Sequence, residues 1–123
     1  KTSNGVTKQT IPRYPGCLVI HEWEIFMPVT VILEVKAKQG MAESLVSMFK
    51  EILPDTRAYD GNIDIKLVQN QDDPSILVAV EQWGTRANYE QYLAWRTENG
   101  SLAAIAEQLD GPPIIRYFDP TDA

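Results

Sequence analysis

Ile76-Leu-Val-Ala-Val-Glu-Gln-Trp83 decides the fold of this chain, and it leads directly into Gly84-Thr-Arg-Ala-Asn-Tyr-Glu-Gln-Tyr-Leu93. It begins with five consecutive apolar residues, three of them β-branched, which predicts a strand covered on both faces. Thr85 is a typical helix N-cap, and the helix that it starts carries Tyr89 and Tyr92. We therefore expect this strand and helix to bring the tryptophan and both tyrosines to one end of the domain.

Three further stretches are predicted to be strands. Val29–Lys36 and Asn62–Asn70 alternate apolar and polar residues with period two, and Ile114–Phe118 is a last short apolar run. The turn Gln71–Pro74 separates the second of these stretches from the central strand Ser75–Trp83. These two strands are therefore expected to form an antiparallel hairpin.

Two regions carry apolar residues at helical spacing. In the first, after a turn at Lys38–Gly40, these residues are Met41, Leu45, Met48, Phe49 and Ile52. Pro54 is predicted to end this helix, with a loop from Asp55 to Gly61. The second helix is expected to break at Asn99-Gly100, because glycine costs ~1 kcal/mol in a helix interior. Helical spacing then resumes with Leu102, Ile105 and Leu109, up to the stop at Gly111-Pro-Pro113.

The resulting order β-α-β-β-α-β predicts an α+β, ferredoxin-like fold with a four-stranded antiparallel sheet and both helices on one face. The other face is also apolar, and a second copy of the chain would cover it, giving a homodimer. Residues 29–118 form the predicted domain, residues 119–123 a tail, and residues 1–28 an N-terminal arm. The arm is expected to lie against its own domain or against a second subunit.

Composition excludes several classes of function. The 123 residues indicate one domain, and the net charge of −6 argues against nucleic-acid binding, which needs a basic surface. No apolar run approaches the ~20 residues of a membrane span, and no signal-peptide pattern opens the sequence, so we expect a cytoplasmic protein without membrane association. With a single Cys and a single His, neither a disulfide nor a His-based metal or haem site is expected.

Several of these features together resemble a known family. They are the strand and helix of residues 29–52, the turn Gln71–Pro74, the strand end Val80-Glu-Gln-Trp83 and the helix start Thr85-Arg-Ala87. Over residues 29–118 the chain resembles the antibiotic biosynthesis monooxygenase family of dimeric α+β barrels. The resemblance implies a cofactor-independent monooxygenase that uses O₂ on a small phenolic, quinol or anthrone-type compound.

Individual positions refine what the resemblance implies. Trp83, and Tyr89 six residues later, stand where cofactor-free anthrone oxygenases have a Trp and a Tyr, which implies a catalytic role for both. The Asn that these enzymes have four residues before the Trp is Ala79 here, so one polar group expected to hold substrate is missing. The haem-degrading members have an Asn, a Trp and a His at places that here hold Leu33, Tyr92 and Leu102. Haem degradation is therefore not expected.

The predicted second helix supplies the remaining candidates, because Tyr89, Tyr92, Leu93 and Arg96 share one of its faces. In an oxygenase, Tyr89 would donate a hydrogen bond to a developing oxyanion, and Arg96 would pair with an anionic ring oxygen. Tyr92 and Trp95 complete the predicted substrate-binding set. The same pattern is also typical of plain core packing, with Arg96 a solvated charge. A non-catalytic small-ligand binding or stress-response protein on the same scaffold is therefore the alternative.

Overall fold

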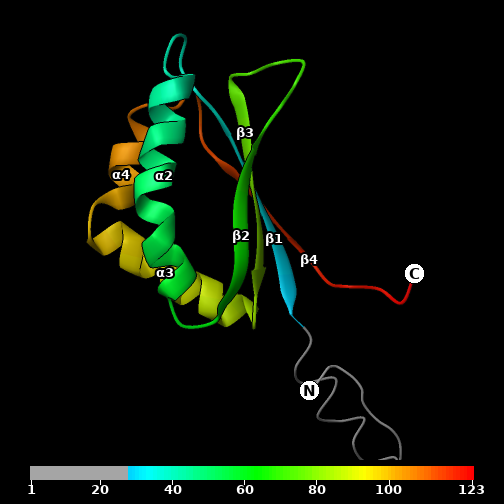
Figure 1. Cartoon of the computed structure of the whole chain (residues 1–123). Helices are drawn as coiled ribbons and strands as arrows, with labels where there is room; N and C mark the ends of the chain where they lie inside the picture. Colours follow the sequence, from blue (N-terminus) through cyan, green and yellow to red (C-terminus); the bar gives the residue numbers. More distant parts are fainter. Residues whose placement is uncertain (1–27) are drawn as a thin grey trace, which may run out of the picture.

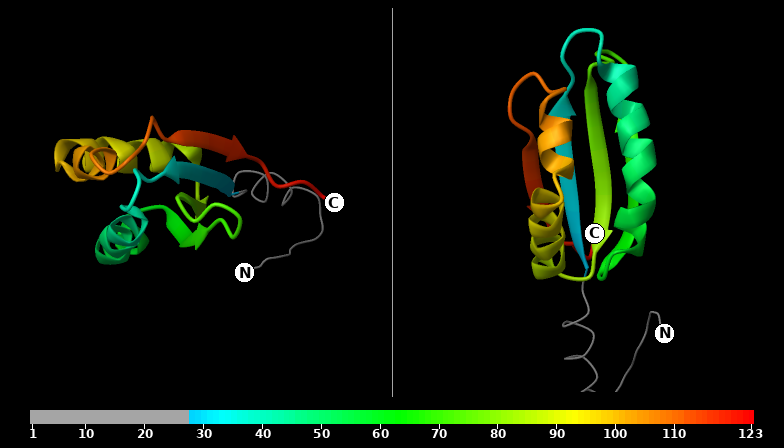
Figure 2. Two further views of the ribbon diagram at one scale, coloured as in Figure 1. Left: turned by 90° about the horizontal axis from the view of Figure 1, so that it is seen from above. Right: turned by 90° about the vertical axis from the view of Figure 1, so that its left-hand side faces the viewer.

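The computed structural model describes residues 28–123, so nearly all of the predicted arm lies outside the described residues. The elements are β1 (Val29–Lys36), α2 (Ala42–Ala58), β2 (Asn62–Gln69), β3 (Ile76–Trp83), α3 (Arg86–Glu98), α4 (Ser101–Ala106) and β4 (Ile114–Phe118). The strands form one antiparallel sheet in the order β2-β3-β1-β4, and all three helices lie on one of its faces (Figures 1 and 2). The predicted α+β, ferredoxin-like fold is confirmed. Within residues 28–123, no helix combines the length and hydrophobicity needed to cross a bilayer.

The central strand β3 divides its side chains between the two faces of the sheet. Leu77, Ala79, Glu81 and Trp83 point toward the helices and are buried, while the residues between them are only partly covered. This alternation follows from the period of two that any strand imposes. The helix-facing side of β3 therefore supports the core and also carries one acidic side chain into it.

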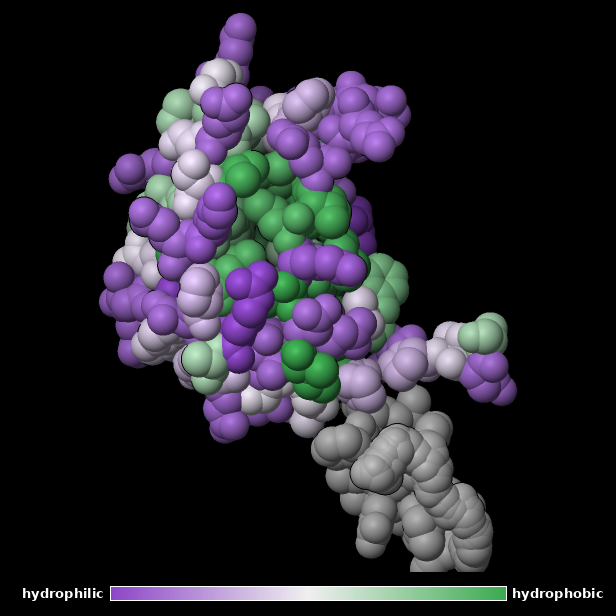
Figure 3. Space-filling view, viewed as in Figure 1, coloured by the Kyte–Doolittle hydropathy of each residue, from purple (hydrophilic) through white to green (hydrophobic). Residues whose placement is uncertain are grey.

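The opposite, outer face of the sheet is open in the single chain. At the centre of the outer face, Val80 of β3 pairs with Ile32 of β1. Next to this pair, Val78 of β3 pairs with Val68 of β2. At the edges of this face Val68 is 44% exposed, Ile114 43% and Phe118 47%. Figure 3 shows hydrophobic residues gathered over the strands, between the polar hairpin turn at the upper right and polar residues below.

Two predicted helix boundaries were wrong. Pro54 does not end the first helix, because α2 continues through it to Ala58. The last turn stays helical because Leu53 and Thr56 are both buried by tertiary packing, which outweighs the hydrogen bond that proline cannot make. The final helix ends at Ala106, before Leu109, which is buried as it forms an isolated bridge with Ala37.

Glycine and asparagine form the break that was predicted between the last two helices. Asn99 caps the end of α3, and Gly100 adopts a φ of 83° before α4 starts at Ser101. A positive φ strains residues that have a Cβ atom, so glycine is favoured at this position.

Pro54 provides a test of this account of α2. The residue is exposed, so replacing it costs no packing, and an alanine would restore an amide donor toward the carbonyl of Lys50. We expect Pro54→Ala to raise the free energy of unfolding by about 1–2 kcal/mol, measured by urea denaturation. Glu51→Ala, at another exposed position of α2, should change it by less than about 0.5 kcal/mol. A less stable Pro54→Ala variant would contradict this account.

Candidate functional site

An aromatic cluster fills the space between the sheet and α3. Trp83, Tyr89 and Tyr92 are all buried there, packed with Val29 and Val31 of β1. The ring centroid of Trp83 lies 5.5 Å from that of Tyr89 and 5.0 Å from that of Tyr92. The strand and helix thus bring together the three aromatic residues that the sequence had placed at one end of the domain.

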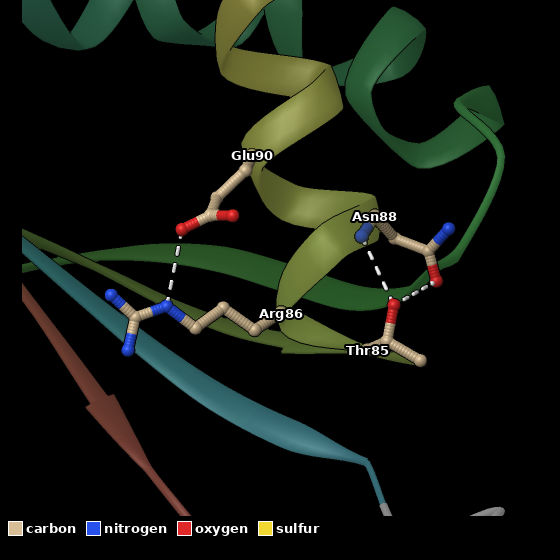
Figure 4. Close-up of polar contacts among 4 residues, drawn as sticks. All are labelled: Thr85, Arg86, Asn88 and Glu90. Atoms are coloured by element: carbon tan, nitrogen blue, oxygen red, sulfur yellow. Dashed lines mark hydrogen bonds and ion pairs between the residues drawn. The ribbon is translucent and has the colours of Figure 1, made fainter.

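Helix α3 is held in position by contacts at its N-terminus. The Thr85 hydroxyl accepts a hydrogen bond from the backbone N–H of Asn88 at 3.0 Å, as the predicted N-cap should (Figure 4). The Asn88 side chain also lies against Gly61, where a Cβ atom would come within 2.4 Å of it. Because Gly61 also has a φ of 94°, this loop can approach the helix closely only with glycine at that position.

Tyr89 is almost completely enclosed, with 1% of its surface exposed. Its hydroxyl has no hydrogen-bond partner among residues 28–123. Burial, followed by the nearby negative charge of Glu81, raises the pKa of Tyr89 far above its ordinary value. The phenol therefore stays protonated at neutral pH and keeps a proton that it can donate.

Glu81 is a member of this cluster that the sequence analysis did not single out. One carboxylate oxygen accepts a hydrogen bond from Trp83 Nε1 at 2.9 Å. Burial raises the pKa of the carboxyl to about 7, and the hydrogen bond from Trp83 opposes this shift only in part. The sequence could have indicated its burial, because the alternation of side chains along β3 places position 81 on the same face as Leu77 and Ala79.

Arg96 is buried, not a solvated surface charge. It donates to the Tyr92 hydroxyl at 2.9 Å, to the Ile52 carbonyl at 2.8 Å and to the Thr56 hydroxyl at 3.0 Å. A further bond reaches Ser101 in α4 at 3.2 Å. The guanidinium therefore joins all three helices, and its hydrogen bonds go to Tyr92, Ile52, Thr56 and Ser101 of the protein itself. A role in substrate binding stays a prediction for this residue.

The predicted aromatic walls differ in exposure. Tyr92 is buried, and its hydroxyl lies 2.6 Å from that of Thr56, while Trp95 is only half-buried. The Trp95 ring stacks at 5.2 Å, centroid to centroid, on Tyr59. Trp95 is thus the predicted substrate-binding residue with the most accessible ring.

A hollow of about 450 Å³ opens at the N-terminal end of α3. It is lined by Val29, Gly84, Thr85, Arg86, Tyr117 and Asp119. The Arg86 guanidinium stacks 3.7 Å from the centroid of the Tyr117 ring and pairs with Glu90 at 3.2 Å (Figure 4). Tyr117 also packs against Tyr89, with ring centroids 5.8 Å apart, and so links the hollow to the buried cluster. Neither Arg86 nor Tyr117 was predicted from the sequence.

Metal-binding groups are not assembled in this region. Among residues 28–123, no three His, Cys, Asp or Glu side chains are grouped so that they could hold a metal ion. The cluster presents one buried carboxyl group, aromatic walls and one phenol that has no partner among residues 28–123.

Glu81 should make the stability of the protein depend on pH. Its pKa rises from 4.5 in the unfolded chain to about 7 in the fold, so between these values the folded state binds the proton more tightly. Stability therefore falls as pH rises through this window, by about 3 kcal/mol in all. Urea denaturation between pH 4 and 8 should show that Glu81→Gln lacks this decline. Glu51→Gln, at an exposed position of α2, should retain it, and parallel curves for wild type and Glu81→Gln would contradict the assignment.

Comparison with proteins of known structure supports the fold. A protein from Methanosarcina mazei is 18% identical, with a TM-score of 0.70 over 79% of this chain and 96% of that one. An antibiotic biosynthesis monooxygenase is 19% identical, with a TM-score of 0.69 over 76% of this chain and 98% of that one. A protein from Pseudomonas aeruginosa is 24% identical, with a TM-score of 0.64 over 77% of this chain and 95% of that one. At these identities the likeness concerns the fold alone.

Sequence comparison assigns the family. No curated protein matches the chain. The family described as antibiotic biosynthesis monooxygenase matches residues 28–106, which span β1 through α4. This range contains every member of the aromatic cluster except the residues of β4. The chain therefore belongs to the antibiotic biosynthesis monooxygenase family.

Proposed function

We propose that this protein is a cofactor-independent monooxygenase that acts on a small phenolic, quinol or anthrone-type compound. The observation that carries the proposal is the Tyr89 hydroxyl, which is buried against Trp83 and lacks a partner among the described residues. A buried donor without a partner is unfavourable, and a ligand oxygen would satisfy it. Membership of the family supports the same reaction class.

In this reaction the substrate itself supplies the electrons. An anthrone CH₂ group and one O₂ become a C=O group and one water, so no separate reductant is consumed. The protein must favour the substrate anion, which transfers an electron to O₂ more readily than the neutral phenol does. Tyr89 would stabilise that anion by donating a hydrogen bond to its oxygen.

The other predicted site residues take supporting roles. Trp83 would form a wall beside Tyr89, and Tyr92 and Trp95 would provide further aromatic surface for a flat substrate. Arg96 contacts the ring of Trp95, with its guanidinium carbon 4.6 Å from the centroid, and donates to Tyr92. We propose that it contributes positive charge to substrate binding through these two residues.

The alternative is a protein of the same fold that binds a small ligand without transforming it. Ala79 favours this alternative, because it stands where the resemblance implies an asparagine that holds substrate. Oxygen consumption separates the two, since a binding protein would take up a phenol or quinol without consuming O₂.

We expect Tyr89→Phe to lower turnover by roughly ten- to a thousandfold, the loss typical of one oxyanion donor. The measurement is O₂ consumption with a panel of reduced quinols and anthrones. Stability should change by about 1 kcal/mol or less, because the ring and its packing remain. Tyr59→Phe is the matched control, because its hydroxyl makes only an exposed 3.5 Å contact to the Gln91 carbonyl. Equal turnover in wild type and Tyr89→Phe would favour the binding protein.

We also propose that the protein is a homodimer that buries the outer face of the sheet. Val78 and Val80 lie at the centre of that face, and the exposed Ile114 and Phe118 lie at its edge. Monomers seldom leave a continuous apolar patch of more than a few hundred Å² in contact with water.

Sedimentation at micromolar concentration should give twice the mass of one chain, or a multiple of it. Val80→Lys places a charge at the centre of the outer face and should yield monomers, because an unpaired buried charge is strongly unfavourable. Glu51→Lys, on the exposed side of α2, changes charge in the same direction and should leave the assembly intact. A folded wild-type monomer at this concentration would refute the dimer.

A further inference from the structure

We propose that Glu81 is the general base that removes the proton from the bound phenol, quinol or anthrone. This inference rests on the proposed function, and it assigns the proton transfer that must precede the reaction with O₂. It follows from the position of the carboxyl group, from its surroundings and from its place in the same row of the sheet as Tyr117.

Glu81 occupies a position where a carboxyl group is costly. It is 2% exposed and is the only acidic side chain that is buried within residues 28–123. Among residues 28–123, its side chain accepts one hydrogen bond, from Trp83 Nε1, and neither ion pair of these residues includes it. Burying a carboxylate with so little compensation is unfavourable, and such groups are found disproportionately at functional sites.

The neighbours of Glu81 make its neutral and charged forms comparable in energy near neutral pH. Burial raises the pKa of the carboxyl to about 7, so about half of the molecules carry a proton acceptor at that pH. The facing residues of the adjacent strands, Val31 and Ile65, are uncharged. The titratable or charged groups that lie in or against the aromatic cluster are Tyr59, Tyr89, Tyr92, Arg96 and Tyr117, and Arg57 donates to the Ile65 carbonyl.

One row of the sheet joins Glu81 to a residue that lines the hollow at the end of α3. Val31 pairs with Glu81 on one side and with Tyr117 on the other, and Tyr117 lines the hollow at the end of α3. Adjacent strands lie ~4.8 Å apart, so about 10 Å of sheet separates Tyr117 from Glu81. Val31 has no exposed surface, so a flat ring can lie beside Glu81 only after the aromatic side chains that pack against Val31 have moved aside.

The proton transfer is simple to balance. The Glu81 carboxylate forms a new O–H bond as the phenolic O–H bond of the substrate, or one benzylic C–H bond of an anthrone, breaks. The electron pair stays on the substrate, which becomes a phenolate or enolate. Tyr89 donates a hydrogen bond to the oxygen of this anion. After O₂ has added to the substrate carbon, the proton returns from Glu81 to the outer oxygen of the peroxide. The C=O bond then forms as the O–O bond and the remaining C–H bond of that carbon break, and the outer oxygen leaves with both hydrogens as water.

The competing explanation is that Glu81 only fixes the Trp83 ring by accepting its N–H. Glu81→Gln separates the two, because the amide oxygen can still accept from Trp83 Nε1 while the side chain can no longer take up a proton near neutral pH. Trp83→Phe is the complementary variant: it removes the hydrogen bond that lowers the pKa of Glu81.

The first experiment measures O₂ consumption against pH with an anthrone substrate. Wild-type turnover should rise with pH through a pKa near 7 as Glu81 ionises. Turnover of Glu81→Gln should be lower by roughly a hundred- to ten-thousandfold and should no longer rise with pH in this range. In Trp83→Phe the rise in turnover should occur at higher pH. Turnover of Glu81→Gln equal to wild type at every pH would overturn the base while leaving the monooxygenase in place.

The second experiment excludes O₂ and follows ionisation of bound dihydroxyanthrone by its visible absorbance. Wild type should bind the coloured anion at a pH where the free compound is neutral, and Glu81→Gln should not. This result without O₂ consumption would support the base and refute the monooxygenase. If wild type ionises the compound no more than Glu81→Gln does, Glu81 is not the general base.

Discussion

The alternation of side chains along β3 is the constraint on which the rest of this domain depends. Leu77 and Ala79 anchor the helices on one face, and two residues further along the same face Glu81 and Trp83 enter the aromatic cluster. A shift of register by one residue would expose all four side chains and bury Val78 and Val80 instead. The core, the candidate site and the proposed dimer face are therefore set by one strand.

The core of the domain divides into an aliphatic part and an aromatic part with different physical properties. The aliphatic part, around Leu45 and Leu77, consists of hydrophobic side chains packed together. The aromatic part holds a carboxyl group, several phenols and a neighbouring guanidinium. Polar groups in such a setting interact strongly because water is excluded, and their ionisation is correspondingly easy to perturb. This separation gathers the buried ionisable groups of residues 28–123 at one end of the domain.

Arg96 shows how a charge can be buried without a carboxylate. Backbone and hydroxyl oxygens of Ile52, Thr56, Tyr92 and Ser101 accept its hydrogen bonds, and the Trp95 ring lies against its guanidinium. Together they replace the water that the ion gives up on folding. The same bonds fix α3 relative to α2, and so they help to hold Tyr89 and Tyr92 over the sheet. Arg96, which the sequence predicted to bind substrate, thus stabilises the packing of the helices.

The sequence by itself determined the order of the elements, the antiparallel hairpin of β2 and β3, the Thr85 cap and the family, because periodicity and turn residues act over short distances. It also placed Trp83, Tyr89 and Tyr92 together, since a strand and the helix directly after it must pack. Only the tertiary structure decided that α2 continues through Pro54 and that Arg96 is buried, because both depend on side chains from other helices. The acidic character of position 81 was visible in the sequence. Its enclosure between sheet and helices, which shifts its pKa toward neutrality, was decided by packing alone.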